Sequence, residues 1–344
     1  MTNKPNHGLR ELAQLAGVSK STASRVISGN GYASPEVKER VLQAAETLRY
    51  KPNAVARAMV TKRTNNLGVI VFREQPPIVS HPLYGKIIDE ILVASEARGY
   101  SVFLKTDREM SLRSTDFLLE QRVDGLILVS RLQKNVIDYV KKFNLPYLMV
   151  NGSTDDPEVI HLVSNDETGG GRAADYLHGQ GHRKFFVIAG PIEHRSHSLR
   201  LAGFTRRLEQ LGISTQSSAV KIVPSPESNF AYGIKLMEEH YQVFIDQGYT
   251  ALFTTNDMLA LGAMKLLLDR GVRIPQEVAV MGYDDIELGS MYSPSLSTVS
   301  VDATGIGRDA VELLDQLIRG VTDLPKLVEY NSHVVIRQST EGRE

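Results

Sequence analysis

Residues 9 to 28 read LRELAQLAGVSKSTASRVIS, and this stretch predicts two short helices joined by a tight turn. Apolar residues of its first part, such as Leu12 and Leu15, recur at helical spacing. Gly17 supplies the left-handed residue that ends a helix, and Ser19 is a typical cap for the next one. The stretch is therefore expected to form a helix-turn-helix unit.

The first turns of the second helix are polar and basic. Their residues are Lys20, Ser21, Thr22, Ser24 and Arg25. A lysine at the positive end of a helix is unfavourable by itself, but a phosphate or base edge facing that end would offset the cost. Ser, Thr and Arg supply hydrogen-bonding groups for the same partners. A solvated helix face would explain any one of these residues alone, whereas the whole pattern predicts DNA binding in a major groove.

Charge is distributed unevenly along the chain. Residues 1 to 63 contain 11 Lys and Arg against 4 Asp and Glu, a net charge of +7. The whole chain of 344 residues has a net charge of −1, so the remainder carries −8. A basic N-terminal region followed by an acidic remainder is expected when only one small domain contacts the phosphates of nucleic acid.

A third helix is followed by residues that predict a short hinge helix. Asn53 can cap a helix of about two turns that runs to Met59, which is too short to be stable alone in water. Ala56 and Met59 share one face, a small residue beside a large apolar one. This arrangement suits two copies that meet and insert a wedge into a minor groove. The alternative is a disordered linker, which residues 61 to 66 resemble.

From Leu67 the sequence alternates short apolar runs with amphipathic helical patterns. The runs are residues 67–72, 100–104, 125–129, 147–150, 184–189, 251–254, 278–282 and 334–336, and the helical patterns include 87–98, 168–180, 198–211 and 258–270. Apolar strands separated by helices predict buried parallel sheets with helices on both faces. A body of roughly 280 residues exceeds the usual size of one core, so two α/β lobes are expected. A ligand would bind in the cleft between them.

Several classes of function are excluded or disfavoured by what the sequence lacks. It has no cysteine, which excludes disulfides and thiolate metal sites. No apolar stretch approaches the roughly 18 residues of a membrane span, and no signal-peptide core is visible, so the chain is expected in the cytoplasm. No nucleophile elbow, paired-carboxylate arrangement or dinucleotide fingerprint is present, so neither an enzyme nor a cofactor is expected.

Two further patterns have ordinary interpretations. Gly169, Gly170 and Gly171 open a helix and could hold an anion, but they lack the spaced glycines and lysine of a nucleotide loop. Close packing is expected there instead. His194 and His197 have the spacing of metal ligands without a nearby acid to complete the site, so they are expected to be polar loop residues.

Six motifs in order give the chain a resemblance to the LacI/GalR family of bacterial transcription regulators. They are LAGVSKSTASRV (15–26), YKPNAVAR (50–57), GHRKFFVIAGP (181–191), RLAGF (200–204), TNDMLALGAM (255–264) and GYDD (282–285). The resemblance covers essentially the whole chain. It implies an all-α helix-turn-helix headpiece with a hinge helix, followed by an α/β two-lobed core with parallel sheets, like that of periplasmic binding proteins.

The resemblance also implies domain boundaries. The headpiece would occupy residues 1–51, the hinge helix and linker 52–66, and the effector-binding and dimerisation core 67–344. Within that core the N-lobe would comprise about 67–164 and 302–328, and the C-lobe about 165–301 and 329–344. The chain would cross between the lobes near Ser164, Val301 and Val328.

Functional residues can be carried over from the family motifs to matching positions. The base-reading residues would be Lys20, Ser21 and Arg25, with Thr22 and Ser24 at phosphates. In the hinge, Asn53 and Ala56 match the family pattern. Met59 stands where similar proteins have an intercalating leucine, and methionine is flexible and similar in volume.

In the cleft, the resemblance points to Asp284 as an acceptor for ligand hydroxyl groups and to Arg200 as a bidentate donor. Asn151 and Asn256 would be further polar contacts, and Tyr84 would stack on a sugar ring. Arg200 could equally pair with an acid of the core. Asp257 and Asp285 fit a structural role better.

The sequence thus predicts a sequence-specific DNA-binding transcription regulator, a repressor of sugar-utilisation genes that acts as a homodimer on a near-palindromic operator. A small sugar bound between the lobes is expected to control operator affinity allosterically. An activator, or a regulator that needs a purine or a phosphorylated partner protein as corepressor, would share every motif. If the chain were a cytosolic sugar-binding protein, its two-lobed core would be explained, but its basic N-terminal region and hinge would have no purpose.

Overall fold

The structure is a computed structural model that describes residues 8–28, 32–50, 63–72, 81–107, 120, 122–130, 134–152 and 158–341. These residues belong to two units, Met1–Thr64 and Asn65–Glu344. The predicted hinge residues Asn53, Ala56 and Met59 lie outside the described residues.

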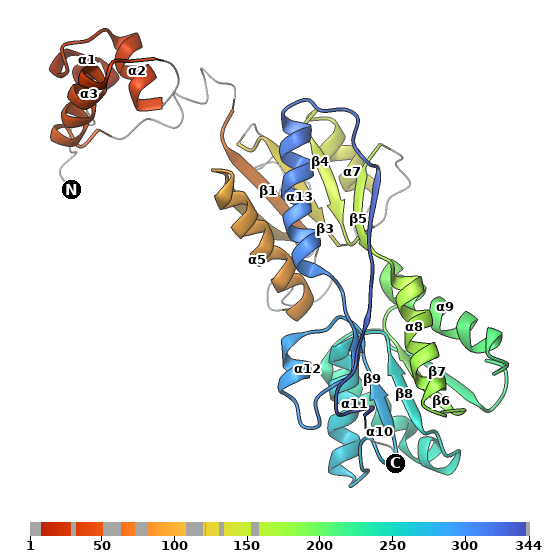
Figure 1. Cartoon of the computed structure of the whole chain (residues 1–344). Helices are drawn as coiled ribbons and strands as arrows, with labels where there is room; N and C mark the ends of the chain where they lie inside the picture. The colour runs from red at the N-terminus through yellow and green to blue at the C-terminus, as the bar shows by residue number, and fades with distance from the viewer. Residues whose placement is uncertain are drawn as a thin grey trace. The chain divides into compact units, whose positions relative to one another are not determined.

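The described part of the first unit is a helical headpiece (Figure 1). Its helices are α1 (Leu9–Leu15), α2 (Lys20–Ser28) and α3 (Pro35–Thr47). Gly17 has a φ of +62° in the turn between α1 and α2, a conformation that glycine adopts without steric cost. The hydroxyl oxygen of Ser19 then accepts the N–H of Thr22 at 3.1 Å and caps α2. The helix-turn-helix predicted from these residues is present.

Small and branched apolar side chains form the core of the headpiece. Leu12 of α1 and Ala16, which follows α1 directly, are buried against Val41 and Ala44 of α3. Leu15 matches the helical spacing, but its side chain is 53% exposed because it lies beside this buried face. The headpiece therefore has a small core, and most of the α2 surface stays exposed.

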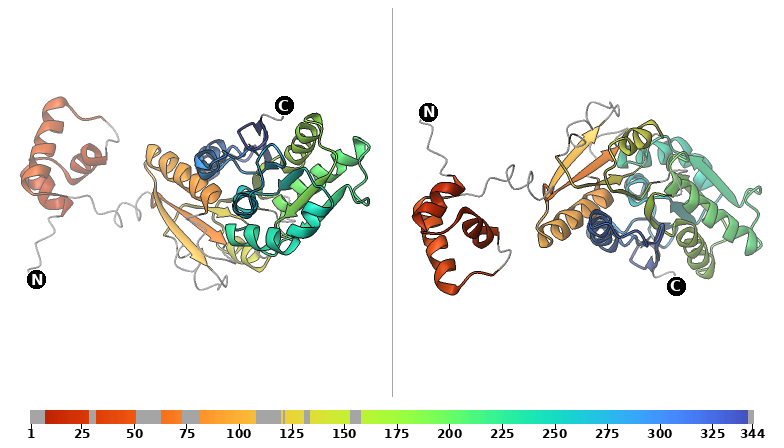
Figure 2. Two further views of the ribbon diagram at one scale, coloured as in Figure 1. Left: turned by 90° about the horizontal axis from the view of Figure 1, so that it is seen from below. Right: turned by 90° about the horizontal axis from the view of Figure 1, so that it is seen from above.

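The first lobe of the second unit is built on a six-stranded parallel sheet in the order β11-β5-β4-β3-β1-β2. Its strands are β1 (Asn66–Phe72), β2 (Ser101–Asp107), β3 (Gly125–Val129), β4 (Tyr147–Val150), β5 (Ile160–Ser164) and β11 (Leu327–Tyr330), and its helices are α5 (Pro82–Ala97), α7 (Lys134–Lys141) and α13 (Ala303–Ile318). Figures 1 and 2 show α13, from late in the chain, beside α5.

The second lobe contains a four-stranded parallel sheet in the order β7-β6-β8-β9. Its strands are β6 (Phe185–Ala189), β7 (Val220–Pro224), β8 (Ala251–Thr254) and β9 (Ala279–Met281), and its helices are α8 (Asp166–Gly179), α9 (Arg195–Gln210), α10 (Phe230–Asp246), α11 (Asp257–Asp269) and α12 (Glu287–Met291). A short antiparallel pair, β10 (Thr298–Val299) and β12 (Val334–Val335), lies beside this sheet.

Successive residues of each central strand pack against opposite layers of helices. In β1, Val69 belongs to the core that includes residues of α5 and α13, whereas Ile70 belongs to the core on the α7 side. In β6, Phe185 faces α8 and α9, and Phe186 faces α10 and α11. The central strands are therefore buried on both faces, which explains why β3, β6 and β8 are continuous apolar runs. The predicted two-lobed α/β core with parallel sheets is confirmed.

The chain passes between the lobes at three places. β5 ends at Ser164, immediately before α8, and β10 ends at Val299 shortly before α13. β11 runs to Tyr330 in the first sheet, two residues past the boundary expected at Val328, before the chain reaches β12.

None of the helices in the described ranges is long and apolar enough to cross a membrane.

Glycines allow α8 and α9 to pack unusually closely. A Cβ atom at Gly170 would overlap the carbonyl oxygen of Arg200, and one at Gly203 would overlap that of Glu167. A Cβ at Gly169 would collide with the hydroxyl of Tyr283. The close packing expected for this glycine run is therefore present, and it brings the start of α8 next to Arg200.

Gly203→Ala is expected to lower the free energy of unfolding by about 1–3 kcal/mol, because the added methyl group must push apart two backbones. Gly171→Ala is the matched control, since its nearest neighbour would be the carbonyl oxygen of Gly203 at 3.7 Å. The control should be neutral, or stabilising by up to about 1 kcal/mol through helix propensity. Urea unfolding followed by circular dichroism measures both, and equal effects of the two substitutions would contradict the packing argument.

Candidate functional site

The predicted DNA-reading residues lie on one short surface of the headpiece. Lys20, Ser21, Ser24 and Arg25 are exposed on α2. Thr22 is half-buried, and its hydroxyl lies 2.8 Å from that of Ser19, the cap of the same helix. The start of α2 therefore presents basic and hydroxyl groups together with the positive end of the helix dipole.

Arg200 of α9 is the centre of a buried charge cluster in the second unit. Its Nε donates to Asp166 Oδ1 at 2.9 Å, and its Nη1 donates to Asp284 Oδ1 at 2.7 Å and to the carbonyl oxygen of Thr255 at 2.8 Å. Its guanidinium also stacks on the ring of Tyr283, 3.9 Å from the centroid. Two carboxylates thus compensate a guanidinium that is almost entirely removed from water.

Asp284 is held by an unusual backbone conformation at the end of β9. Its φ is +120°, and that of Asp285 is +58°. Asp257 supports this turn, because one of its carboxylate oxygens accepts the N–H of Ile286 at 2.9 Å and the other accepts the hydroxyl of Thr298 at 2.6 Å. Burial raises the pKa of Asp257 well above its usual value. Asp257 is therefore a support for Asp284, in line with the structural role expected for it.

Asp285, the other residue expected to be structural, forms an ion pair with an arginine other than Arg200. Arg337 Nη2 donates to Asp285 Oδ1 at 2.6 Å, and Arg337 Nη1 donates to the carbonyl oxygen of Leu296 at 2.8 Å. The Asp285 carboxylate is thus neutralised at the edge of the second lobe. The two adjacent aspartates of the GYDD motif have separate guanidinium partners.

A second polar network joins the two lobes. The Tyr84 hydroxyl lies 3.3 Å from Ser130 Oγ and 3.3 Å from His194 Nε2, and it accepts from Asn151 Nδ2 at 3.1 Å. Asn151 Oδ1 in turn accepts the hydroxyl of Ser196 at 3.0 Å. Tyr84, Ser130 and Asn151 belong to the first lobe, whereas His194 and Ser196 belong to the second.

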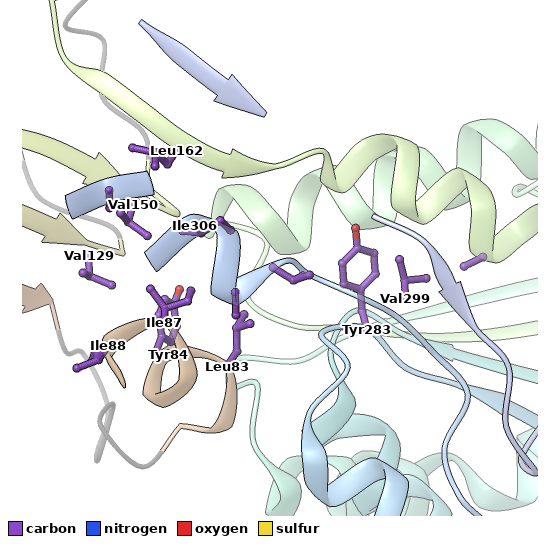
Figure 3. Packing of buried hydrophobic residues seen from close by; sticks show 14 of the residues in the cluster. Leu83, Tyr84, Ile87, Ile88, Val129, Val150, Leu162, Tyr283, Val299 and Ile306 are labelled. Atoms are coloured by element: carbon purple, nitrogen blue, oxygen red, sulfur yellow. The ribbon is translucent and has the colours of Figure 1, made fainter. Parts of the chain in front are cut away.

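Figure 3 shows the packing that positions Tyr84 for these hydrogen bonds. Its ring packs with Leu83 and Ile87 of α5 among apolar residues of the first lobe, while Tyr283 extends from the second lobe. The Tyr84 ring is buried, and burial raises the pKa of its hydroxyl, which therefore remains protonated at neutral pH. Ring stacking on a ligand, as expected from the sequence, is limited by this burial, but the hydroxyl is placed for hydrogen bonding.

Asn256 is placed differently from the other predicted contacts. Its Oδ1 accepts the N–H of Leu259 at 3.0 Å and caps α11, and its Nδ2 donates to the carbonyl oxygen of Ser228 at 2.8 Å. The structure thus brings Arg200 and Asp284 into one cluster and Tyr84 and Asn151 into another. The amide of Asn256 contacts neither cluster.

Several cleft residues were not among the predicted contacts. Asp166 follows β5, a strand that lacks a clear apolar run, and its Oδ2 is buried without a hydrogen bond among the described residues. His81 occupies the N-cap position of α5 without a side-chain capping bond, and its Nδ1 is also buried without a hydrogen bond within the described ranges. Burial and then the charge of Arg200 lower the pKa of His81 to about 4. The polar strand end and the His81-Pro82 helix start were the available signals.

The histidine pair expected to be loop residues lies at the start of α9. His194 caps α9 and His197 is buried within its first turn, with Nδ1 2.8 Å from the hydroxyl of Thr255. Burial, and then the charge of His194, lower the pKa of His197 well below its usual value. The prediction that these were ordinary polar loop residues is therefore wrong, because one caps α9 and the other is buried within it. Among the described residues, no group of three His or acidic side chains is arranged to hold a metal ion.

An open groove of about 760 Å³ lies between the first half of α5 and the segment from Asp284 to α12. His81, Lys86 and Asp89 line its first-lobe side, and Asp284, Glu287 and Met291 are among the residues that line the other. The volume lies in the upper part of the roughly 300–1,000 Å³ range of small-molecule pockets. The groove and the Arg200 cluster therefore form one candidate binding cleft, joined at Asp284.

Asp166→Ala is expected to lower the free energy of unfolding by about 3–5 kcal/mol, because it removes one of the two carboxylates that compensate buried Arg200. The adjacent Glu167→Ala is the matched control. Glu167 pairs with Arg206 where both side chains are partly exposed, so its loss should cost less than about 1 kcal/mol. Urea unfolding of the two variants measures these changes. Equal losses in the free energy of unfolding would show that burial of Arg200 does not depend on its ion pair with Asp166.

Comparison with known proteins gives the same two-part organisation. Residues 8–53 match the model of the bacterial regulatory proteins of the lacI family, and residues 174–340 match a periplasmic binding protein-like domain. The transcriptional regulator CelR of Thermobifida fusca is 31% identical over 338 residues, covering 96% of this chain and 97% of CelR. The transcriptional repressor PurR of Pasteurella multocida is 28% identical over 341 residues, covering 97% of this chain and 99% of PurR.

Solved structures match over nearly the whole chain as well. The Lac repressor dimer bound to operator and the anti-inducer ONPF has a TM-score of 0.85 at 27% identity, covering 98% of this chain and 99% of the repressor. A CelR–cellobiose complex has a TM-score of 0.72 at 28% identity, covering 98% of this chain and all of CelR. These relatives are regulators, which confirms the prediction that the chain is not an enzyme. The chain belongs to the lacI family of bacterial regulatory proteins and is a DNA-binding transcriptional repressor.

Proposed function

We propose that this repressor controls sugar-utilisation genes and that a sugar bound between its lobes sets its affinity for operator DNA. The observation that carries this proposal is the buried Arg200–Asp284 pair, whose aspartate lines the groove. A planar guanidinium and a carboxylate held together provide donors and acceptors side by side, which suits the vicinal hydroxyl groups of a sugar. The relative CelR, solved with cellobiose, supports the same ligand class.

Arg200, Asp284, Asn151 and the hydroxyl of Tyr84 would make the ligand contacts. Asn256 would act on the site indirectly, because its amide is already used to position α11. A purine corepressor, the ligand class implied by the name of PurR, is the second candidate.

Control of DNA affinity follows from linkage between the two sites. A ligand changes operator affinity only as far as it binds one lobe arrangement more tightly than the other, and couplings of about 1–3 kcal/mol are typical. The Tyr84–His194 and Asn151–Ser196 hydrogen bonds join the lobes. A sugar that hydrogen-bonds to Tyr84 and Asn151 would replace these direct bonds between the lobes. Ligand binding and lobe arrangement would thereby be coupled.

The DNA partner would be a near-palindromic operator read by two copies of the headpiece. The exposed side chains of Lys20, Ser21 and Arg25 would read base edges, with Thr22 and Ser24 at phosphates. Two-fold symmetry of a dimer gives matching half-sites. The hinge residues Asn53, Ala56 and Met59 would contact the minor groove between them.

Fluorescence anisotropy of the full-length protein on palindromic duplexes selected from a random library tests DNA reading. We expect binding that weakens with salt, with a log-log slope of about −0.9 per neutralised phosphate. Lys20→Ala should lower the discrimination between the preferred base and the other bases by about 1–3 kcal/mol at particular operator positions. Lys38→Ala, at an exposed position of α3, is the control that should keep the preference. Uniform weakening by Lys20→Ala would reassign this residue to phosphate contact, and binding of no palindrome would refute the proposed near-palindromic operator.

Release from the operator by a panel of sugars and purines tests the effector class, and its pH dependence tests Asp284. Burial raises the pKa of Asp284 to about 6, against the lowering effect of Arg200. The ionised carboxylate is the stronger acceptor, so sugar affinity should be constant well above pH 6 and fall as the pH drops through 6. Asp284→Asn should weaken sugar binding and remove this pH dependence, while Asp285→Asn should keep it. Tighter operator binding with a purine would favour the corepressor function instead.

A further inference from the structure

One carboxylate oxygen of the buried charge cluster is left without a hydrogen bond. Asp166 is the first residue of α8, and its side chain is completely buried. Its Oδ1 accepts the N–H of Arg200 Nε at 2.9 Å, whereas its Oδ2 has no hydrogen-bond partner within the described ranges. A guanidinium and a carboxylate can form two parallel hydrogen bonds, but this pair does not use Oδ2. Asp166 therefore keeps one acceptor available inside the molecule.

The position of this oxygen favours a ligand as its partner. An unpaired buried acceptor destabilises a protein, more so when it is charged, so most such atoms are satisfied by protein groups, ordered water or ligands. Asp166 holds the same guanidinium as Asp284, and Asp284 lines the open groove. Asp166 Oδ2 therefore belongs to the group of side chains that the proposed sugar would contact.

The charge of the cluster restricts which ligand group can approach this oxygen. Arg200 carries one positive charge, and it is paired with the negative charges of both Asp166 and Asp284. Burial lowers the pKa of His81 to about 4 and that of His197 well below its usual value, so neither histidine adds a positive charge at neutral pH. A carboxylate or phosphate group of a ligand would thus meet an excess of negative charge, whereas a hydroxyl group can donate to Oδ2.

We propose that Asp166 is a ligand-contacting residue that selects an uncharged sugar. One hydroxyl of the bound sugar donates to Asp166 Oδ2, and neighbouring hydroxyls contact Arg200 and Asp284. Sugar acids and sugar phosphates are rejected, because the cluster already holds more carboxylates than cations. The proposal rests on the sugar-responsive function, and it adds a second carboxylate contact and the charge of the ligand.

Isothermal titration calorimetry of the full-length protein tests the charge of the ligand. The neutral probes are glucose, galactose, xylose, cellobiose, maltose and lactose, the anionic probes are glucuronate, galacturonate and glucose 6-phosphate, and hypoxanthine represents the purines. We expect one neutral sugar to bind at least about tenfold more tightly than any anionic sugar. An anionic sugar that binds as tightly as every neutral sugar would overturn the proposed selection.

Asp166→Asn separates a ligand contact from a purely structural role. The amide oxygen can still accept from Arg200 Nε, but an N–H donor replaces the free acceptor beside it. The preferred neutral sugar should bind about tenfold more weakly, and the anionic sugars should bind as well as before or better. Asp175→Asn is the matched control on α8, because Asp175 pairs with Arg207 where both side chains are partly exposed, and it should change neither affinity. Equal weakening of neutral and anionic sugars by Asp166→Asn would leave Asp166 a structural role alone and overturn the contact.

Deoxy analogues of the preferred sugar identify the hydroxyl that donates to Asp166. Removal of this hydroxyl should weaken binding to the wild type about tenfold, whereas Asp166→Asn should bind the analogue and the parent sugar about equally. If an ordered water satisfied Oδ2 instead, the effects of the substitution and of the missing hydroxyl would add for every analogue. Such additivity would overturn the direct contact.

Failure of this contact and failure of the proposed function give different results. If a sugar acid or sugar phosphate releases the operator and no neutral sugar does, the sugar-responsive function stands and the proposed selection is wrong. If no sugar binds, neutral or anionic, both the sugar-responsive function and the role of Asp166 are wrong. Binding of hypoxanthine alone would then favour the corepressor function.

Discussion

The burial of the Arg200 guanidinium is the constraint on which the effector core depends. A cation almost entirely removed from water is stable only with close opposite charge and satisfied hydrogen bonds. Asp166 comes from the start of α8, Asp284 from the turn after β9, and the carbonyl of Thr255 from the end of β8. One side chain thus ties three segments together at the carboxyl edge of the second sheet, next to the first lobe.

Much of the surrounding sequence serves to meet that requirement. The glycines at 170 and 203 let α8 and α9 approach closely enough for Asp166 to reach Arg200. Asp257 holds the turn in which Asp284 has a φ of +120°, a strained conformation for a residue with a side chain. These residues touch no ligand in the proposed site. Their role is to hold Arg200 and its carboxylate partners in the geometry that the buried ion pairs require.

The sequence predicted the strands that are continuous apolar runs and missed β5, β7 and β11, in which His161, Lys221 and Glu329 interrupt the run. β3, β4 and β8 are buried on both faces, so their apolar runs have the same bounds as the strands. β7 and β11 are edge strands with exposed positions, and no apolar run marks them. Family motifs identified Arg200 and Asp284, but Asp166 and His81 become site residues only through contacts between distant segments. A polar strand end and a helix start mark these two positions locally, but nothing in a single sequence shows that either lies beside Arg200.

The charge cluster is also connected to the places where the chain changes lobes. The ring of Tyr283 packs under the Arg200 guanidinium, and its hydroxyl lies 3.1 Å from Ser332 Oγ, which lies 2.9 Å from Ser164 Oγ. Ser164 ends β5 and Ser332 follows β11, so both stand at crossings between the lobes. A ligand that changes the partners of Arg200 therefore acts on a side chain in direct contact with the crossing segments. Because Tyr283 is fully buried, it cannot shift without moving its neighbours. The contact route from the cleft to the lobe arrangement is thus short.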